Sequence, residues 1–132
     1  MGTAIQLIEK DSLRATASGY EFLVHLNWYR SLPLSSVVSV QLKLDGTPVD
    51  PGLISFGIND HVYKLDDLAD QIEEFWFVQD GARLIIEQPG KIAPKETHTI
   101  EVELALRFPY IPIGPGKFLV NTTKYASTQI AA

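Results

Sequence analysis

Strict alternation of apolar and polar residues is the feature that most constrains the fold of this chain. Between residues 99 and 108 every even position is apolar, from Ile100 to Phe108, and most odd positions are polar. Residues 20–28 and 37–44 show the same period of two. Successive side chains of a strand point to opposite faces, so each segment predicts a strand with one buried face. A helix would scatter these apolar residues around its whole circumference.

Weaker versions of the pattern predict further strands, and turn residues separate them. Asp45-Gly46 lies between two extended runs and is a strong signal for a tight hairpin turn. Asp50-Pro51-Gly52 marks a second turn, and residues 88–96 form a longer polar connection. The weaker strands are expected at residues 4–10, 12–17, 53–58, 82–88 and 118–127.

One short helix is expected among these strands. Apolar residues recur at positions i, i+3, i+4 and i+7 over residues 65–72, which is the spacing of one helical face. Asp66 and Asp67 stand in the first turn, where acidic side chains favour the helix dipole. Short antiparallel strands at close spacing are typical of a sandwich of two sheets. We therefore predict an all-β fold, a single antiparallel β-sandwich domain over residues 1–132 with one short helix.

The composition excludes several kinds of site. The chain has 132 residues and no cysteine, which rules out disulfides, thiolate metal sites and thiol nucleophiles. Eleven Lys and Arg against sixteen Asp and Glu give a net charge of −5, which disfavours binding to nucleic acid. No apolar run reaches the roughly 20 residues of a membrane helix, and no signal peptide is visible. We therefore expect a cytoplasmic protein with no membrane contact.

The sequence offers few candidate catalytic groups. His25, His61 and His98 are far apart in the sequence and form no HxH or HxxxH pair, so a metal site is not expected in this chain. Each of the three is expected to face solvent or to lie in a loop. The acidic pair at residues 66–67 is explained as charge at a helix N-terminus, and the pair at residues 73–74 as solvated. We expect no catalytic residue and no cofactor in this chain.

Three apolar clusters, at residues 28–35, 75–78 and 108–113, are harder to explain within one domain. The last of them is expected to run from a strand into a Pro-rich loop. A strand of a sandwich buries only one face in its own domain. A run that is apolar at both odd and even positions therefore needs a second surface to cover its other face. Aromatic residues with a lone Arg are typical of interface cores. In an alternative explanation, Trp28 and Trp76 cap the ends of the sandwich core.

These clusters carry a resemblance to a known family. Over about residues 20–125 the chain resembles the small, or beta, subunit of bacterial C-glycoside deglycosidases. Residues 29–35, Tyr-Arg-Ser-Leu-Pro-Leu-Ser, are similar to the family's Tyr-Arg-Gly-Leu-Pro-Leu-Ser, with Ser31 in place of the Gly. The order and spacing of further similar segments also agree. These segments are residues 40–46, 63–68, 76–77, 101–107 and 109–110.

The resemblance implies an activity that is divided between two subunits. The family cleaves the carbon–carbon bond between a sugar and an aromatic aglycone in 3-oxo-C-glycosides. The ketone at C3, made by a separate oxidase, acidifies the C2 proton, and the resulting enolate expels the aglycone by β-elimination. A divalent metal such as Mn²⁺ and the general base belong to a larger subunit that resembles a sugar-isomerase barrel. This chain would be the accessory subunit of that carbon–carbon lyase, in a hetero-oligomer.

The resemblance and the apolar clusters together predict where the larger subunit binds. Tyr29 would stack on a ring of the partner or aglycone, and Arg30 would pair with a partner carboxylate. An exposed salt bridge of small worth is the alternative for Arg30. The residues expected at the interface, or in the wall of the substrate pocket, are Tyr29, Arg30, Leu32, Pro33, Trp76, Phe77, Tyr110 and Ile111.

Two other hypotheses stay open on the sequence alone. A stand-alone carbohydrate-binding β-sandwich module would expose Trp and Tyr side chains as a flat platform for sugar rings. A self-sufficient enzyme would use a carboxylate pair such as Asp66 and Glu73.

Overall fold

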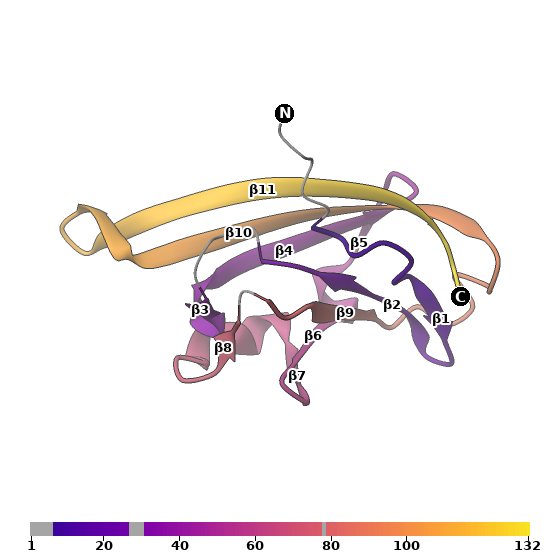
Figure 1. Cartoon of the computed structure of the whole chain (residues 1–132), viewed down its shortest axis with the longest axis horizontal. Coiled ribbons are helices and arrows are strands. Elements are labelled where there is room, and N and C mark those ends of the chain that lie inside the picture. The colour runs from indigo at the N-terminus through magenta and orange to yellow at the C-terminus, as the bar shows by residue number, and fades with distance from the viewer. Residues whose placement is uncertain (1–6, 27–30, 78) are drawn as a thin grey trace.

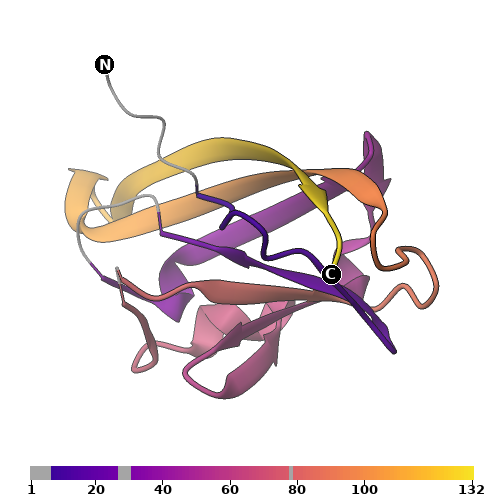
Figure 2. The same cartoon turned by 45° about the vertical axis from the view of Figure 1, so that its right-hand side comes forward.

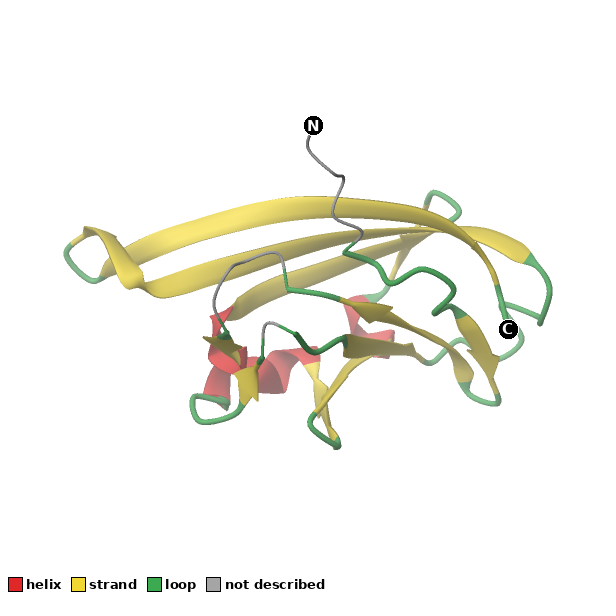
Figure 3. Cartoon of the chain, in the orientation of Figure 1, coloured by secondary structure: helices red, strands yellow, loops and turns green. Residues whose placement is uncertain are grey.

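The structure is a computed structural model, and it describes residues 7–26, 31–77 and 79–132, with only the backbone for Pro109. The described strands form antiparallel sheets of five, four and two strands (Figures 1 and 3). The two larger sheets lie face to face, and the long strands of the four-stranded sheet arch over the other (Figure 2). This arrangement confirms the predicted all-β sandwich of two antiparallel sheets.

The larger sheet has five strands: β1 (Arg14–Thr16), β2 (Gly19–Val24), β6 (Ile54–Ile58), β7 (His61–Lys64) and β9 (Ala82–Ile86). Their order across the sheet is β1-β2-β9-β6-β7, with antiparallel neighbours throughout. A tight turn joins β6 to β7 through Asn59 and Asp60, whose φ angles are 51° and 66°. Two consecutive positive φ angles are what a type I′ hairpin turn requires.

The second sheet has four strands: β4 (Val37–Leu44), β5 (Thr47–Val49), β10 (Thr97–Gly114) and β11 (Lys117–Ile130). Their order is β11-β10-β4-β5. The predicted turn at Asp45 and Gly46 is confirmed, with φ angles of 50° and 84°. β10 pairs with β11 almost to its end, but with β4 only as far as Leu106 opposite Val37.

Two short strands, β3 (Leu32–Pro33) and β8 (Phe75–Trp76), pair at one end of the sandwich. Three 3₁₀ helices, η1 (Leu34–Ser36), η2 (Pro51–Leu53) and η3 (Leu65–Asp70), complete the described elements. None of the described helices is long and apolar enough to span a membrane.

The predicted helix over residues 65–72 corresponds to η3 but differs from it in type and length. Residues i and i+3 lie above one another in a 3₁₀ helix, so Leu65 and Leu68 share the face that packs on the core. Ile72, predicted to continue that face, lies beyond the end of η3 and is 68% exposed. The α-helical spacing therefore predicted the wrong packing for Ile72.

The core lies between the two large sheets and is formed by the alternating apolar residues. Burial of each large apolar side chain contributes roughly 1.5–3 kcal/mol, so these rows hold the sheets together. The strand predicted at residues 20–28 is confirmed as far as Val24, where β2 ends. Leu26 lies beyond the strand but is still buried, and residues 27 and 28 lie outside the described residues. The buried rows comprise Phe22, Val24 and Leu26, then Val40, Leu42 and Leu44, and then Ile100, Val102, Leu104, Leu106 and Phe108.

The weaker strand predictions have mixed outcomes. Strands β1, β6, β9 and β11 lie where they were expected. In the segment 4–10, residues 4–6 lie outside the described residues, and Ile8 forms only an isolated bridge to Val24. Strands β3, β7 and β8 were not predicted, because short edge strands carry too few residues for alternation to be visible.

The Pro-rich loop expected after Phe108 is wrong, because β10 continues as a strand to Gly114. Its register against β11 shifts between Phe108 and Pro112 and again before Gly114. A proline cannot donate a backbone hydrogen bond, so it is tolerated mainly on strands that lack a neighbour on one side. That condition holds here, because the pairing with β4 has already ended at Leu106.

Candidate subunit interface

The distal part of the β10–β11 hairpin projects beyond the rest of the sandwich. We call residues 107–120 the projecting ribbon; it begins just past Leu106, the last residue of β10 that pairs with β4. Figure 1 shows its tip extending past β3, β4 and β8. A two-stranded ribbon buries little surface by itself and is marginally stable in water. The projecting ribbon is therefore the part of the described fold that gains most from an external cover.

The side chains of the projecting ribbon are unusually apolar for such an exposed segment. Ile113 is 63% exposed, Val120 is 47% exposed and Tyr110 is 36% exposed. Ile111 and Leu119 are partly buried and pack against the edge of the core. Exposed apolar residues from both strands thus gather on one short ribbon, which is typical of a surface that binds another protein.

A second apolar feature lies at the same end of the molecule. The rings of Phe75 and Phe77 are stacked, with centroids 6.4 Å apart and planes inclined by 27°. Phe75 is 37% exposed and Phe77 is 44% exposed. β8, which contains Phe75, lies on the same left-hand side of the molecule in Figure 1, below the projecting ribbon.

Two of the predicted interface residues are buried inside this chain instead. Leu32 and Trp76 are 2% and 1% exposed and pair with each other across β3 and β8. The Trp76 ring packs edge-on against Phe56 with centroids 5.3 Å apart, and its Nε1–H donates to the carbonyl of Asp80 at 2.9 Å. A fully packed and hydrogen-bonded indole belongs to the core, so the alternative explanation, that Trp76 caps the sandwich, is the better one.

The other predicted interface residues have different surroundings. Phe77 and Tyr110 are exposed, and Ile111 and Pro33 are half-buried at the surface. Their positions fit an interface, and the role itself stays a prediction. Tyr29 and Arg30 lie outside the described residues.

Glu74 is the centre of a polar network, so its interpretation as a solvated carboxylate is wrong. Its Oε1 atom contacts His61 Nδ1 and accepts from the Tyr63 hydroxyl at 2.9 Å. Asn59 Nδ2 donates to Glu74 Oε2 at 3.2 Å and to the carbonyl of Phe75 at 2.8 Å. These bonds, first of all the one from His61, hold the pKa of Glu74 below its usual range. The network spans three segments, and no local pattern in the sequence links them.

His98 also departs from its prediction, since its side chain is only 14% exposed. Its Nδ1 lies 2.6 Å from Asp45 Oδ2 and its Nε2 lies 3.1 Å from Glu96 Oε1. Carboxylates only accept hydrogen bonds, so donation from both ring nitrogens requires a protonated imidazole. The bond to Asp45, with a smaller effect from Glu96, raises the pKa of His98. This ion pair ties the β4–β5 turn to the start of β10.

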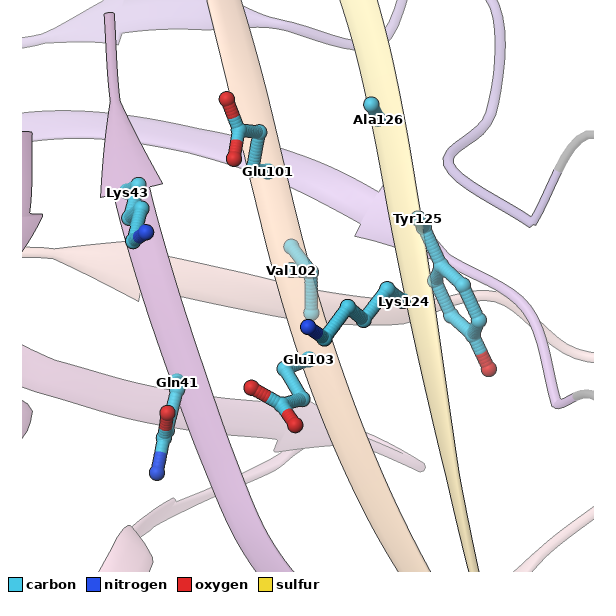
Figure 4. A pocket seen from close by; sticks show the side chains of 8 residues that line it. All are labelled: Gln41, Lys43, Glu101, Val102, Glu103, Lys124, Tyr125 and Ala126. Atoms are coloured by element: carbon cyan, nitrogen blue, oxygen red, sulfur yellow. The ribbon is translucent and has the colours of Figure 1, made fainter. Parts of the chain in front are cut away.

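A polar hollow on the outer face of the four-stranded sheet bears on the carbohydrate-binding hypothesis (Figure 4). Lys43 lies opposite Glu101, and Glu103 lies opposite Lys124, so charges of both signs alternate across it. Tyr125 is the only aromatic residue among the described ones that line it, and it is just 6% exposed. The hollow offers no exposed ring on which a sugar can stack, so the structure does not favour a carbohydrate-binding platform there.

The hypothesis of a self-sufficient enzyme also finds little support in the described residues. Asp66 and Glu73 are both exposed, so neither carboxylate has the partly buried setting that is typical of a general acid. Within the described ranges, no group of three or more His, Asp or Glu side chains is placed to hold a metal ion.

A β-sandwich with an exposed apolar ribbon at one end has the features of a subunit of a larger assembly. Comparison with known proteins identifies the family. A family model described as C-glycoside deglycosidase beta subunit matches residues 4–110. The 3'-dehydrocarminate deglycosidase beta subunit of a Microbacterium species is 34% identical over 108 residues, which are 82% of this chain and 80% of that one.

Two further relatives agree with that match. The C-glycoside deglycosidase beta subunit of Arthrobacter globiformis is 31% identical over 121 residues, or 92% of each chain. That of Microbacterium trichothecenolyticum is 29% identical over 126 residues, or 96% of this chain and 95% of that one. This chain belongs to the C-glycoside deglycosidase beta subunit family, and membership as a beta subunit implies a heteromeric partner.

Proposed function

We propose that this chain is the accessory subunit of a carbon–carbon lyase that cleaves 3-oxo-C-glycosides between the sugar and the aglycone by β-elimination. The observation that carries the proposal is the projecting ribbon, whose exposed apolar residues at positions 110, 113 and 120 need a cover that the described chain does not supply. The family relationship supports the activity, since its members are named as subunits of deglycosidases of C-glycosides. We place the complex in the cytoplasm.

The partner in this proposal is a larger subunit that resembles a sugar-isomerase barrel. We assign the general base and a divalent metal such as Mn²⁺ to that subunit. The contribution of this chain is to stabilise the partner and to exclude water from its active site, where a drier surrounding strengthens electrostatic interactions.

The form of the projecting ribbon favours contact through side chains over extension of the sheet. Beyond Leu106 the edge of β10 that faced β4 has no strand neighbour among the described residues. Pro109 and Pro112 lie on this stretch and remove two backbone donors from it. Proline is a common means of preventing strand addition at an exposed edge. We therefore propose that the partner packs against the apolar side chains of the ribbon.

A pair of matched variants tests the assignment. Ile113→Asp places a charge on the projecting ribbon, and Ile130→Asp places the same charge near the other end of β11, where the isoleucine is equally exposed, 64% against 63%. Truncation or charging of a central interface residue typically costs about 2 kcal/mol or more, so Ile113→Asp should weaken assembly roughly 30-fold. Ile130→Asp should leave assembly unchanged, as measured by the dissociation constant of the complex.

Two outcomes would contradict the proposed function. Equal affinities of both variants for the larger subunit would remove the projecting ribbon from the interface. Full turnover of a 3-oxo-C-glycoside by the larger subunit alone would show that this chain has no part in the reaction.

A further inference from the structure

The network around Glu74 fixes the protonation pattern of an exposed histidine. Glu74 Oε1 faces Nδ1 of His61 and also accepts from the hydroxyl of Tyr63 at 2.9 Å. The pKa of the Glu74 carboxyl is held low by these bonds, so the group is ionised and can only accept. Nδ1 of His61 must therefore carry the proton of the Glu74–His61 hydrogen bond.

It follows that the neutral His61 ring presents its other nitrogen to the outside as an acceptor. A neutral imidazole has one donor and one acceptor nitrogen, and the hydrogen bond made by one nitrogen sets the state of the other. The His61 side chain is 61% exposed, and its Nε2 has no hydrogen-bond partner among the described residues. An outward acceptor with a fixed tautomer suits a ligand that donates a hydroxyl.

Aromatic rings accompany this acceptor. The Tyr63 ring meets the His61 ring edge-on, with centroids 6.1 Å apart. Phe75 directly follows Glu74, and the bond from Asn59 to its carbonyl fixes its backbone beside the β6–β7 turn. The exposed ring of Phe75 stacks on that of Phe77. An aromatic ring beside a placed hydrogen-bonding group offers a ligand an apolar contact and a polar one together.

Anchoring of the β6–β7 turn does not by itself explain why Glu74 contacts the His61 ring. Asn59 already joins the turn to the carbonyl of Phe75 at 2.8 Å, and Tyr63 already joins β7 to Glu74. Those two bonds hold the hairpin against the segment before β8. The additional contact from Glu74 to His61 therefore orients the ring rather than the hairpin.

We propose that His61 Nε2, exposed on β7 of the five-stranded sheet, binds a hydroxyl group of the glycoside substrate. Glu74 is a positioning residue in this site, because it holds the ring with Nε2 outward and does not itself face the ligand. The inference rests on the proposed function, since it takes the glycoside to be the ligand that the complex brings to this surface.

The first test uses the full chain alone and is independent of the proposed function. Nitrogen-15 NMR of the imidazole rings, at a pH where His61 is neutral, reports which nitrogen carries the proton. We expect protonated Nδ1 and unprotonated Nε2 for His61, and a larger Nε2–H fraction in Glu74→Gln, whose amide is a weaker acceptor. A wild-type ring with its proton on Nε2 would overturn the inference.

The second test uses the complex with the larger subunit and 3'-dehydrocarminate as the probe. His61→Gln should raise KM about three- to tenfold, the effect of one lost hydrogen bond, with kcat changed less than about twofold. The matched control is His25→Gln, because His25 also pairs with a glutamate, Glu9, at 2.9 Å but on another segment. We expect the control to keep the wild-type KM.

Each remaining outcome counts against the inference or against its basis. An unchanged KM in His61→Gln would overturn it. A normal KM with weaker binding of the larger subunit would also overturn it, since His61 would then contact protein instead of glycoside. A wild-type complex that turned over neither 3'-dehydrocarminate nor any other 3-oxo-C-glycoside would overturn the proposed function and with it the identity of the ligand, while the tautomer measured on the chain alone would stand.

Discussion

The two halves of β10 differ in their strand neighbours and in their burial, although they belong to one continuous strand. Residues 100–106 lie between β4 and β11, and their even-numbered side chains are almost fully buried. Residues 107–114 have β11 as their neighbour, carry two prolines, and expose Tyr110 and Ile113. The first half completes its packing within this chain. The second half presents apolar surface that the described chain leaves uncovered, which is where a partner gains most.

Trp76 and Phe77 show the same contrast between a buried and an exposed side chain. Substitution of Trp76 is expected to have the largest effect on stability. Trp76 is 1% exposed and Phe77 is 44% exposed. Trp76→Ala should lower the free energy of unfolding of the isolated chain by about 3–5 kcal/mol, the usual cost of emptying such a core site. Phe77→Ala should change it by less than about 1 kcal/mol. Urea denaturation of both variants measures the difference.

One result would contradict the assignment of Trp76 to the core. If Trp76→Ala folded with wild-type stability and failed to bind the larger subunit, Trp76 would be an interface residue after all.

A smaller effect concerns the end of the sandwich that carries the β4–β5 turn. The pKa of His98 is raised by Asp45 and Glu96, so its stabilising contribution is complete below the ordinary histidine pKa and is lost as pH rises through the raised value. The pKa values of both carboxyls are lowered, so their contribution is lost as pH falls through those lowered values. The carboxylates are half-exposed, so screening by solvent keeps the effect small.

Urea denaturation across a range of pH checks this expectation. His98→Asn should flatten the fall in stability on the alkaline side and leave the unfolding of the core otherwise unchanged. An unchanged alkaline slope in His98→Asn would show that the ion pair contributes nothing to folding. Assembly with the larger subunit should be the same for the variant and the wild type, because His98 lies away from the projecting ribbon.

The sequence predicted the part of the molecule in which local pattern and tertiary packing agree. Alternation identified the rows through Phe22, Leu42 and Val102 because each strand buries one face and exposes the other. The turn at Asp45 and Gly46 was visible because type I′ turns need residues that tolerate positive φ. These features are decided within a few residues, so a single sequence suffices.

What the sequence did not reveal depends on contacts between distant segments. The run 108–113 looked like a loop because of its prolines, and only the loss of β4 as a neighbour makes a strand possible there. Trp76 looked available for a partner because its packing against Phe56 comes from another strand. The bonds from Glu74 to Asn59 and Tyr63 cross from one segment to another in the same way. Burial in the folded chain, which the sequence does not show, therefore distinguishes the core residues from the candidate interface residues.

Hydrogen–deuterium exchange on the free chain and on the complex with the larger subunit tests the central claim most directly. Amides of residues 107–120 should exchange quickly in the free chain and become protected in the complex, because the partner covers the projecting ribbon. Amides of residues 100–106, already paired on both sides by β4 and β11, should be protected to the same degree in both samples. Unchanged exchange of residues 107–120 in the complex would contradict the account.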